Sequence, residues 1–86
     1  MKVIFTLHAK EKLLTIEAKL LKITQKTVTD ILNIPLTVNK NLNPHRSIGK
    51  LNNKLSLVVI WKTENGIIKV ITFYPAEKGR YENKIL

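Results

Sequence analysis

The sequence predicts an α+β fold in which two N-terminal helices pack on one face of a mainly antiparallel sheet. Two observations carry this prediction. Apolar residues recur at helical spacing in the first third of the chain, and the second half contains strand-like runs separated by Asn-Asn and Asn-Gly turn signals. The 86 residues suit one small domain, residues 1–86, with a two-layer core.

The first elements are expected to be a short strand and a helix. Residues 3–7, VIFTL, have the composition of a strand. The next stretch predicts a helix over residues 8–20, because apolar side chains step by three or four positions along one face: Ala9, Leu13, Ile16 and Leu20.

A second helix is expected over residues 24–33. Thr24 is a suitable N-cap, and Ile23 and Val28 are placed to form a hydrophobic staple around it. Pro35 forbids continuation of the helix. Residues 41–45, NLNPH, then predict a loop.

The rest of the chain predicts three antiparallel strands, with the sequences HRSIGKL, KLSLVVIWKT and IIKVITFY. Asn65-Gly66 is typical of a two-residue type I′ hairpin turn, which needs positive φ at both positions. Such a turn places Trp61 opposite Val70 and Lys62 opposite Lys69, and it places Tyr74 on the same face as Trp61. We expect the Trp61 face, with Tyr74, to be buried under the helices and the Lys62 face to stay partly open.

The sheet face on which Arg46 lies depends on the length of the turn between the strands HRSIGKL and KLSLVVIWKT. A two-residue turn at Asn52-Asn53 puts Arg46 on the helix-covered face, whereas a three-residue turn that adds Lys54 puts it on the open face.

The net charge of +9, from 15 basic and 6 acidic residues, favours a polyanionic partner, and RNA or single-stranded DNA comes first. A composition bias is the alternative, because 13 of the basic residues are lysine. There is no cysteine, no apolar run of membrane-spanning length and no signal-peptide pattern, so we expect a cytoplasmic protein that does not enter a membrane.

Several short motifs carry a family resemblance: FTLHA at a helix start, ITQKTVTDILNIP, SIG, LVVIW and VITFYPA. Together they resemble a small bacterial and archaeal family known only as a domain of unknown function, which is similar in layout to the BrnT and RelE toxins. The resemblance covers nearly the whole chain. It differs at one point, since the family usually has arginine four residues after its histidine and this chain has Lys12.

The resemblance implies metal-independent RNA cleavage with scattered basic residues and a C-terminal aromatic side chain, without a cofactor or a metal. It also implies an acidic antitoxin-like protein as partner. Cleavage needs a base for the ribose 2′-hydroxyl, cations for the charge at phosphorus and an acid for the leaving oxygen. The candidate catalytic residues are His8, Arg46, Lys78, Arg80 and Tyr81.

Each candidate also has a structural interpretation. His8 is suited to proton transfer near neutral pH, but it can equally cap or pack the first helix. Arg80 is suited to hold a phosphate, but it can equally form a surface ion pair. Tyr81 is suited to stack on a base or to pack the tail on the sheet. The candidate nucleic-acid-binding lysines are Lys12, Lys50, Lys62 and Lys69.

Three functions therefore stay open. The first is a toxin-like endoribonuclease. The second is a non-catalytic module that binds RNA or single-stranded DNA, and the third is a protein-interaction domain whose charge reflects composition alone. The tail YPAEKGRYE is either a phosphate-facing edge or a solvated end that protects the sheet.

Overall fold

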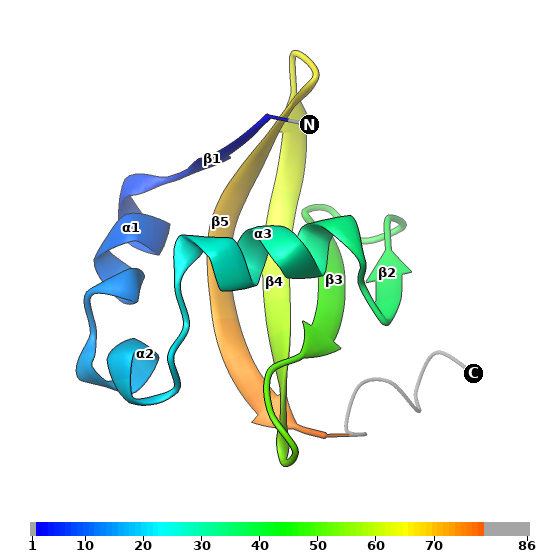
Figure 1. The fold of residues 1–86 in the computed structure, drawn as a ribbon. Helices are drawn as coiled ribbons and strands as arrows, with labels where there is room; N and C mark the ends of the chain where they lie inside the picture. Colours follow the sequence, from blue (N-terminus) through cyan, green and yellow to red (C-terminus); the bar gives the residue numbers. More distant parts are fainter. Residues whose placement is uncertain (1, 79–86) are drawn as a thin grey trace.

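The structure is a computed structural model that describes residues 2–78. Three helices pack on a five-stranded mixed sheet, which confirms the predicted α+β class (Figure 1). The elements in chain order are β1 (Val3–Phe5), α1 (Leu7–Leu13), α2 (Ile16–Leu20), α3 (Gln25–Asn33), β2 (Thr37–Asn39), β3 (His45–Lys50), β4 (Leu55–Glu64) and β5 (Ile67–Glu77). The strand order across the sheet is β1-β5-β4-β3-β2. Only the β1–β5 pair of these five strands is parallel.

The helix expected over residues 8–20 is instead two short helices, α1 and α2. Thr15 separates them, because its hydroxyl donates to the carbonyl of Lys12 at 2.7 Å and accepts from the backbone N–H of Ala18 at 3.2 Å. The same side chain therefore ends one helix and caps the next. The break leaves Ile16 and Leu20, which were expected in the core, 77% exposed each.

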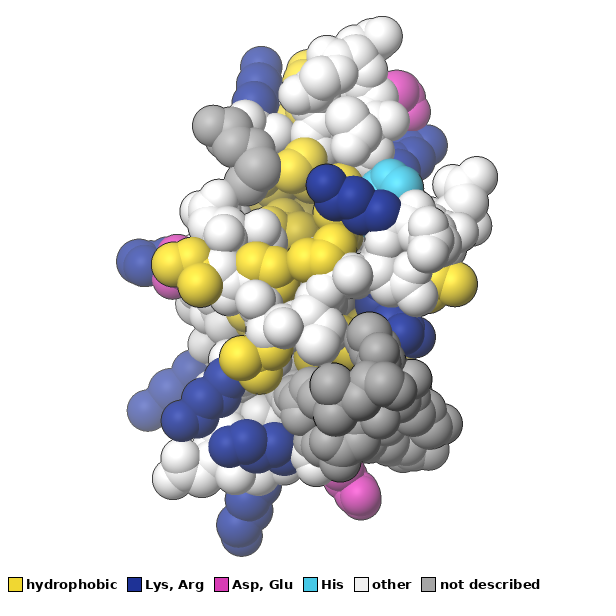
Figure 2. Space-filling model, turned by 90° about the vertical axis from the view of Figure 1, so that its right-hand side faces the viewer, with side chains coloured by type: hydrophobic (Ala, Val, Ile, Leu, Met, Phe, Trp, Pro, Cys, Tyr) yellow, Lys and Arg dark blue, Asp and Glu magenta, His cyan; other side chains and the backbone are white. Residues whose placement is uncertain are grey.

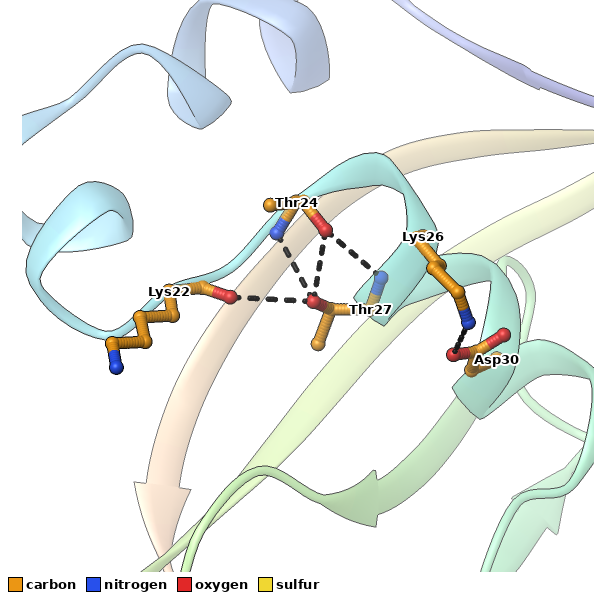
Figure 3. A network of polar contacts seen from close by, with 5 residues as sticks. All are labelled: Lys22, Thr24, Lys26, Thr27 and Asp30. Atoms are coloured by element: carbon orange, nitrogen blue, oxygen red, sulfur yellow. Dashed lines mark hydrogen bonds and ion pairs between the residues drawn. The ribbon is translucent and has the colours of Figure 1, made fainter.

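The second expected helix is confirmed as α3, and a network of threonine contacts fixes its start (Figure 3). The hydroxyl of Thr24 accepts from the backbone N–H of Thr27, while the hydroxyl of Thr27 accepts from the backbone N–H of Thr24. This is the reciprocal pattern of a capping box, with threonine at N3. Ile23 and Val28 are buried on either side of the cap, as the staple predicts.

The core lies between the helices and one face of the sheet. Trp61 is buried there, as expected, together with Leu57, Val59, Val70 and Phe73. These four side chains are no more than 1% exposed. Where α3 crosses β3 in Figure 1, Gly49 lies so close to the helix that a Cβ on it would come within 2.6 Å of the Cγ1 of Ile31.

The β4–β5 hairpin has the predicted turn and a register that changes along its length. Asn65 and Gly66 have φ of 53° and 75°, and Lys62 pairs with Lys69 as expected. On the side of Trp61 away from the turn, however, a β-bulge between Ile60 and Trp61 shifts the register by one residue, so that Ile60 pairs with Thr72. Every β5 side chain after the bulge therefore points to the face opposite to the one predicted.

The bulge corrects the prediction for Tyr74. This residue was expected beside Leu57 on the helix-covered face, but it pairs with Val58 on the opposite face, here called the far face. The far face has a small buried cluster of its own, consisting of Ile48, Val58 and Ala76. Ile60 and Tyr74 pack against this cluster and are half-buried.

The β3 register answers the question about Arg46. The β3–β4 pairing runs to Lys50 and Ser56, and the backbone N–H of Leu51 bonds to the carbonyl of Leu55, so residues 52–54 form the turn. This is the three-residue alternative, and it places Arg46 beside Ile60 on the far face. The sequence reading missed β2, a three-residue strand that pairs with β3 and places Asn39 beside Arg46.

Candidate functional site

The edge of β5 is shared by β1 and α1. β1 pairs with β5 only over Ile68–Val70. Beyond that point α1 lies beside β5, and Thr6, its N-cap, donates its hydroxyl to the carbonyl of Ile71 at 3.2 Å. This contact ties the start of the helix to the bulged part of the strand, so side chains on one face of α1 reach over the strand edge.

From this position, the side chains of His8 and Lys12 both contact Thr72. They are four residues apart in α1 and therefore lie on the same helix face. The Nζ of Lys12 donates to the Oγ1 of Thr72 at 3.2 Å, and the Nε2 of His8 lies 3.3 Å from the same oxygen. Two residues predicted from the sequence for different roles thus converge on one hydroxyl group.

The geometry of this cluster suits an anion. A hydroxyl group accepts two hydrogen bonds and donates one, so Thr72 accommodates Lys12 together with either protonation state of His8. Both distances are at the long end of the hydrogen-bond range. A ligand oxygen that approached from solvent would meet an ammonium group, an imidazole and a hydroxyl group within a few ångströms, because His8 is exposed.

Aromatic rings hold the ammonium group of Lys12 in place. Its Nζ lies 5.6 Å from the ring centre of Phe73 and 5.8 Å from that of Tyr74. Cation–π contacts of this kind contribute roughly 0.5–1 kcal/mol at accessible positions. Tyr74 also brings a half-buried aromatic ring to the far face next to the cluster.

Arg46 lies on the same sheet face, two strands from Thr72. The pairing Arg46–Ile60–Thr72 runs straight across β3, β4 and β5. With strands about 4.8 Å apart, the two backbones are separated by roughly 10 Å. Arg46 is half-buried, and the part of the far face between it and Thr72 is the apolar side chain of Ile60.

The paired lysines of the hairpin are already bridged by a carboxylate group. The two carboxylate oxygens of Glu64 lie 3.1 Å from the Nζ of Lys62 and 2.7 Å from the Nζ of Lys69. Hydrogen bonds from Lys69 and then Lys62 hold the pKa of Glu64 below its usual value of 4.5. The carboxylate group of Glu64 therefore offsets the expected repulsion between the two lysines. It also neutralises part of their positive charge, so an external anion would bind this pair more weakly than it would bind two unpaired lysines.

Two other predicted residues that the structure describes, Lys50 and Lys78, lie outside the contacts to Thr72. Lys50 lies at the end of β3 and lines a hollow beside α3. Lys78 follows β5, where its backbone N–H bonds to the carbonyl of Lys54 at 3.0 Å. Arg80 and Tyr81 lie outside the described residues. Of the seven predicted site residues that the structure describes, His8 and Lys12 thus meet on Thr72, Lys62 pairs with Lys69, and Arg46 lies on the same sheet face as Thr72.

Sequence reasoning missed Thr72 and Tyr74 as members of this site. The unbulged register put Tyr74 under the helices and gave Thr72 no role. No signal in the strand IIKVITFY marks the bulge, because it has neither glycine nor proline at that point. His45, treated as a loop residue, begins β3 and packs edge-on against Trp61, with ring centres 4.7 Å apart.

Within residues 2–78, no three histidine or carboxylate side chains cluster as metal ligands do, and no helix is long and apolar enough to cross a membrane. Comparison with protein-family models, with curated proteins and with solved structures found no match to this chain.

Proposed function

We propose that the protein is a metal-independent endoribonuclease that acts at the cluster formed by His8, Lys12 and Thr72. The observation that carries this proposal is the meeting of an imidazole and an ammonium group on one hydroxyl group at 3.3 and 3.2 Å. Proton transfer and charge stabilisation are the two requirements of RNA cleavage without a metal.

In the proposed reaction, the ribose 2′-oxygen attacks the adjacent phosphorus, and the bond from phosphorus to the 5′-oxygen breaks. The products are a 2′,3′-cyclic phosphate and a free 5′-hydroxyl group. His8 takes the proton of the 2′-hydroxyl group as the new bond forms, and its imidazolium returns that proton to the leaving 5′-oxygen. Lys12 stabilises the charge that develops on the phosphate oxygens. Arg46, whose backbone lies roughly 10 Å from that of Thr72 by the spacing of β-strands, holds a neighbouring phosphate of the same RNA chain.

The test is cleavage of an end-labelled mixed RNA by purified protein in the presence of a chelator. His8→Ala should lower the rate by about 10²–10⁴-fold, the usual contribution of a positioned acid or base. Lys12→Gln should lower it by roughly 10²–10³-fold. Lys10→Gln is the matched control, because Lys10 is exposed on α1 and lies outside the contacts to Thr72. Wild-type protein that leaves every RNA intact would show that the proposed activity is wrong for those RNAs.

A non-catalytic module for RNA or single-stranded DNA is the second candidate, supported by the net charge of +9. Cationic side chains release counterions from the nucleic acid on binding, so the logarithm of affinity should fall with the logarithm of salt concentration by about 0.7 per phosphate contact. Binding with this salt dependence but without cleavage would favour this candidate over the enzyme.

A further inference from the structure

Exposed apolar side chains border a groove on the side of α3 that faces the end of β3. Ile34 and Leu36, which follow the helix, are 84% and 58% exposed. They line the groove together with Thr27, Asp30 and Ile31 of α3 and with Lys50 of β3. Figure 2, which views the molecule from the side of β2, shows hydrophobic side chains in the middle of that side and lysine or arginine side chains above and below them. Apolar surface bordered by charge is typical of an interaction site.

The floor of the groove is a fixed part of the fold. Ile31 is 5% exposed and packs on Gly49, where even an added Cβ would come within 2.6 Å of it. The contact holds α3 against β3, so the groove exists before any partner binds. Along α3 its wall follows Thr27, Asp30 and Ile31, which are spaced at three and four residues from Thr27 as on one helix face. A second helix packs well against such a wall.

The charges around the groove are unequal. Asp30, its acidic residue, is already paired with Lys26 at 2.8 Å (Figure 3). Lys50 makes no ion pair with any side chain in residues 2–78. An occupant with acidic side chains is therefore favoured. A second copy of this chain is not, because it would bring another net charge of +9 and the same lysine to the contact.

From this groove we infer a docking site for an amphipathic, acidic helix of a partner protein. The apolar face of the partner helix packs on Ile34 and Leu36, and a glutamate or aspartate at its edge pairs with Lys50. The site is separate from the contacts of His8 and Lys12 with Thr72, so it holds whether or not the protein cleaves RNA.

The probe is a synthetic helical peptide of leucine and glutamate with all leucines on one face. Two control peptides carry lysine in place of glutamate, or the same residues in an order that has no apolar face. Binding to the full chain is followed by calorimetry and by methyl NMR shifts. We expect the acidic amphipathic peptide to bind at least tenfold more tightly than either control, with shifts at Ile31, Ile34 and Leu36.

Ile34→Ser should weaken that binding about tenfold or more, because the partner helix would no longer bury a large aliphatic side chain at this position. Leu20→Ser is the matched control, because Leu20 is 77% exposed on α2 and does not line the groove. Lys50→Glu should also weaken binding. Equal affinity of wild type and Ile34→Ser, or equal affinity for the acidic and basic helices, would overturn the inference. Self-association in sedimentation equilibrium that Ile34→Ser abolishes would do so too, because the occupant would then be a second copy.

Discussion

The indole N–H of Trp61 donates a hydrogen bond of 2.8 Å to the Oγ of Ser47, and both side chains are buried. Ser47→Ala leaves that N–H without this partner in the core. We expect a loss of about 1–3 kcal/mol in the free energy of unfolding, which is the usual cost of an unsatisfied buried donor. Urea unfolding measures it. In a Trp61→Phe background, which has no N–H, the same serine substitution should cost much less, and an equal cost in both backgrounds would contradict this account.

The close approach of Gly49 to Ile31 makes a second prediction. Gly49→Ala places a Cβ within 2.6 Å of the Cγ1 and 2.8 Å of the Cγ2 of Ile31. Overpacking of this kind costs about 1–3 kcal/mol of stability. Because both atoms are absent in Ile31→Ala, most of that cost should disappear in the double variant, as a double-mutant cycle by urea unfolding would show. Additive losses would mean that α3 does not lie this close to β3.

Much of this fold follows from local sequence signals. Thr24 with Ile23 and Val28 predicted the start of α3, and Asn65-Gly66 predicted the hairpin turn and the Lys62–Lys69 pair. These features depend on residues that are near one another in the chain. β2 is different, because its three residues are held by pairing with β3 and have weak strand character of their own.

The site was only partly predictable, because its geometry also depends on pairing between residues that are far apart in the chain. His8 and Lys12 were identified by residue type, but their meeting point depends on the bulge between Ile60 and Trp61. One extra residue in β5 moves Thr72 and Tyr74 to their present faces, and no local signal marks it. The position of Arg46 likewise depended on whether the preceding turn has two or three residues.

Glu64 makes hairpin stability depend on pH. Its pKa is lowered in the folded state by Lys69 and Lys62, so its contribution is present above pH 4.5 and is lost as pH falls through the folded pKa. Wild type should therefore melt at a higher temperature than Glu64→Gln near neutral pH. The gap should close below pH 4.5. Thermal melts of both proteins across this range provide the measurement, and a gap that does not change with pH would argue against the ion pairs.

The same carboxylate competes with phosphate for Lys62 and Lys69. Glu64→Gln frees both ammonium groups, so we expect tighter binding of single-stranded RNA and a steeper salt dependence. The slope of log affinity against log salt should increase by about 0.7 for each new phosphate contact. Lys26→Gln/Asp30→Asn, which removes a distant ion pair on α3 without changing the net charge, is the control. An unchanged slope in Glu64→Gln would place RNA away from the hairpin.

Thr72 is the residue whose substitution best separates a catalytic cluster from a packing contact. Thr72→Val keeps the shape of the side chain but removes the oxygen that both Lys12 and His8 contact. If this hydroxyl group positions the two side chains for RNA cleavage, the rate should fall by about ten- to a hundredfold, the equivalent of one hydrogen bond to a charged group. Thr72→Ser retains the oxygen and should restore most of the rate.

RNA affinity should change little in either Thr72 variant, because the cationic groups stay in place. The cleavage rate should fall in Thr72→Val and return in Thr72→Ser, since the oxygen that Lys12 and His8 contact is lost and then regained. A role in strand packing alone predicts a different result: Thr72→Val would change the melting temperature while the cleavage rate stayed as in wild type. Full activity in Thr72→Val beside an inactive His8→Ala would remove Thr72 from the site and leave His8 to act with Lys12 alone.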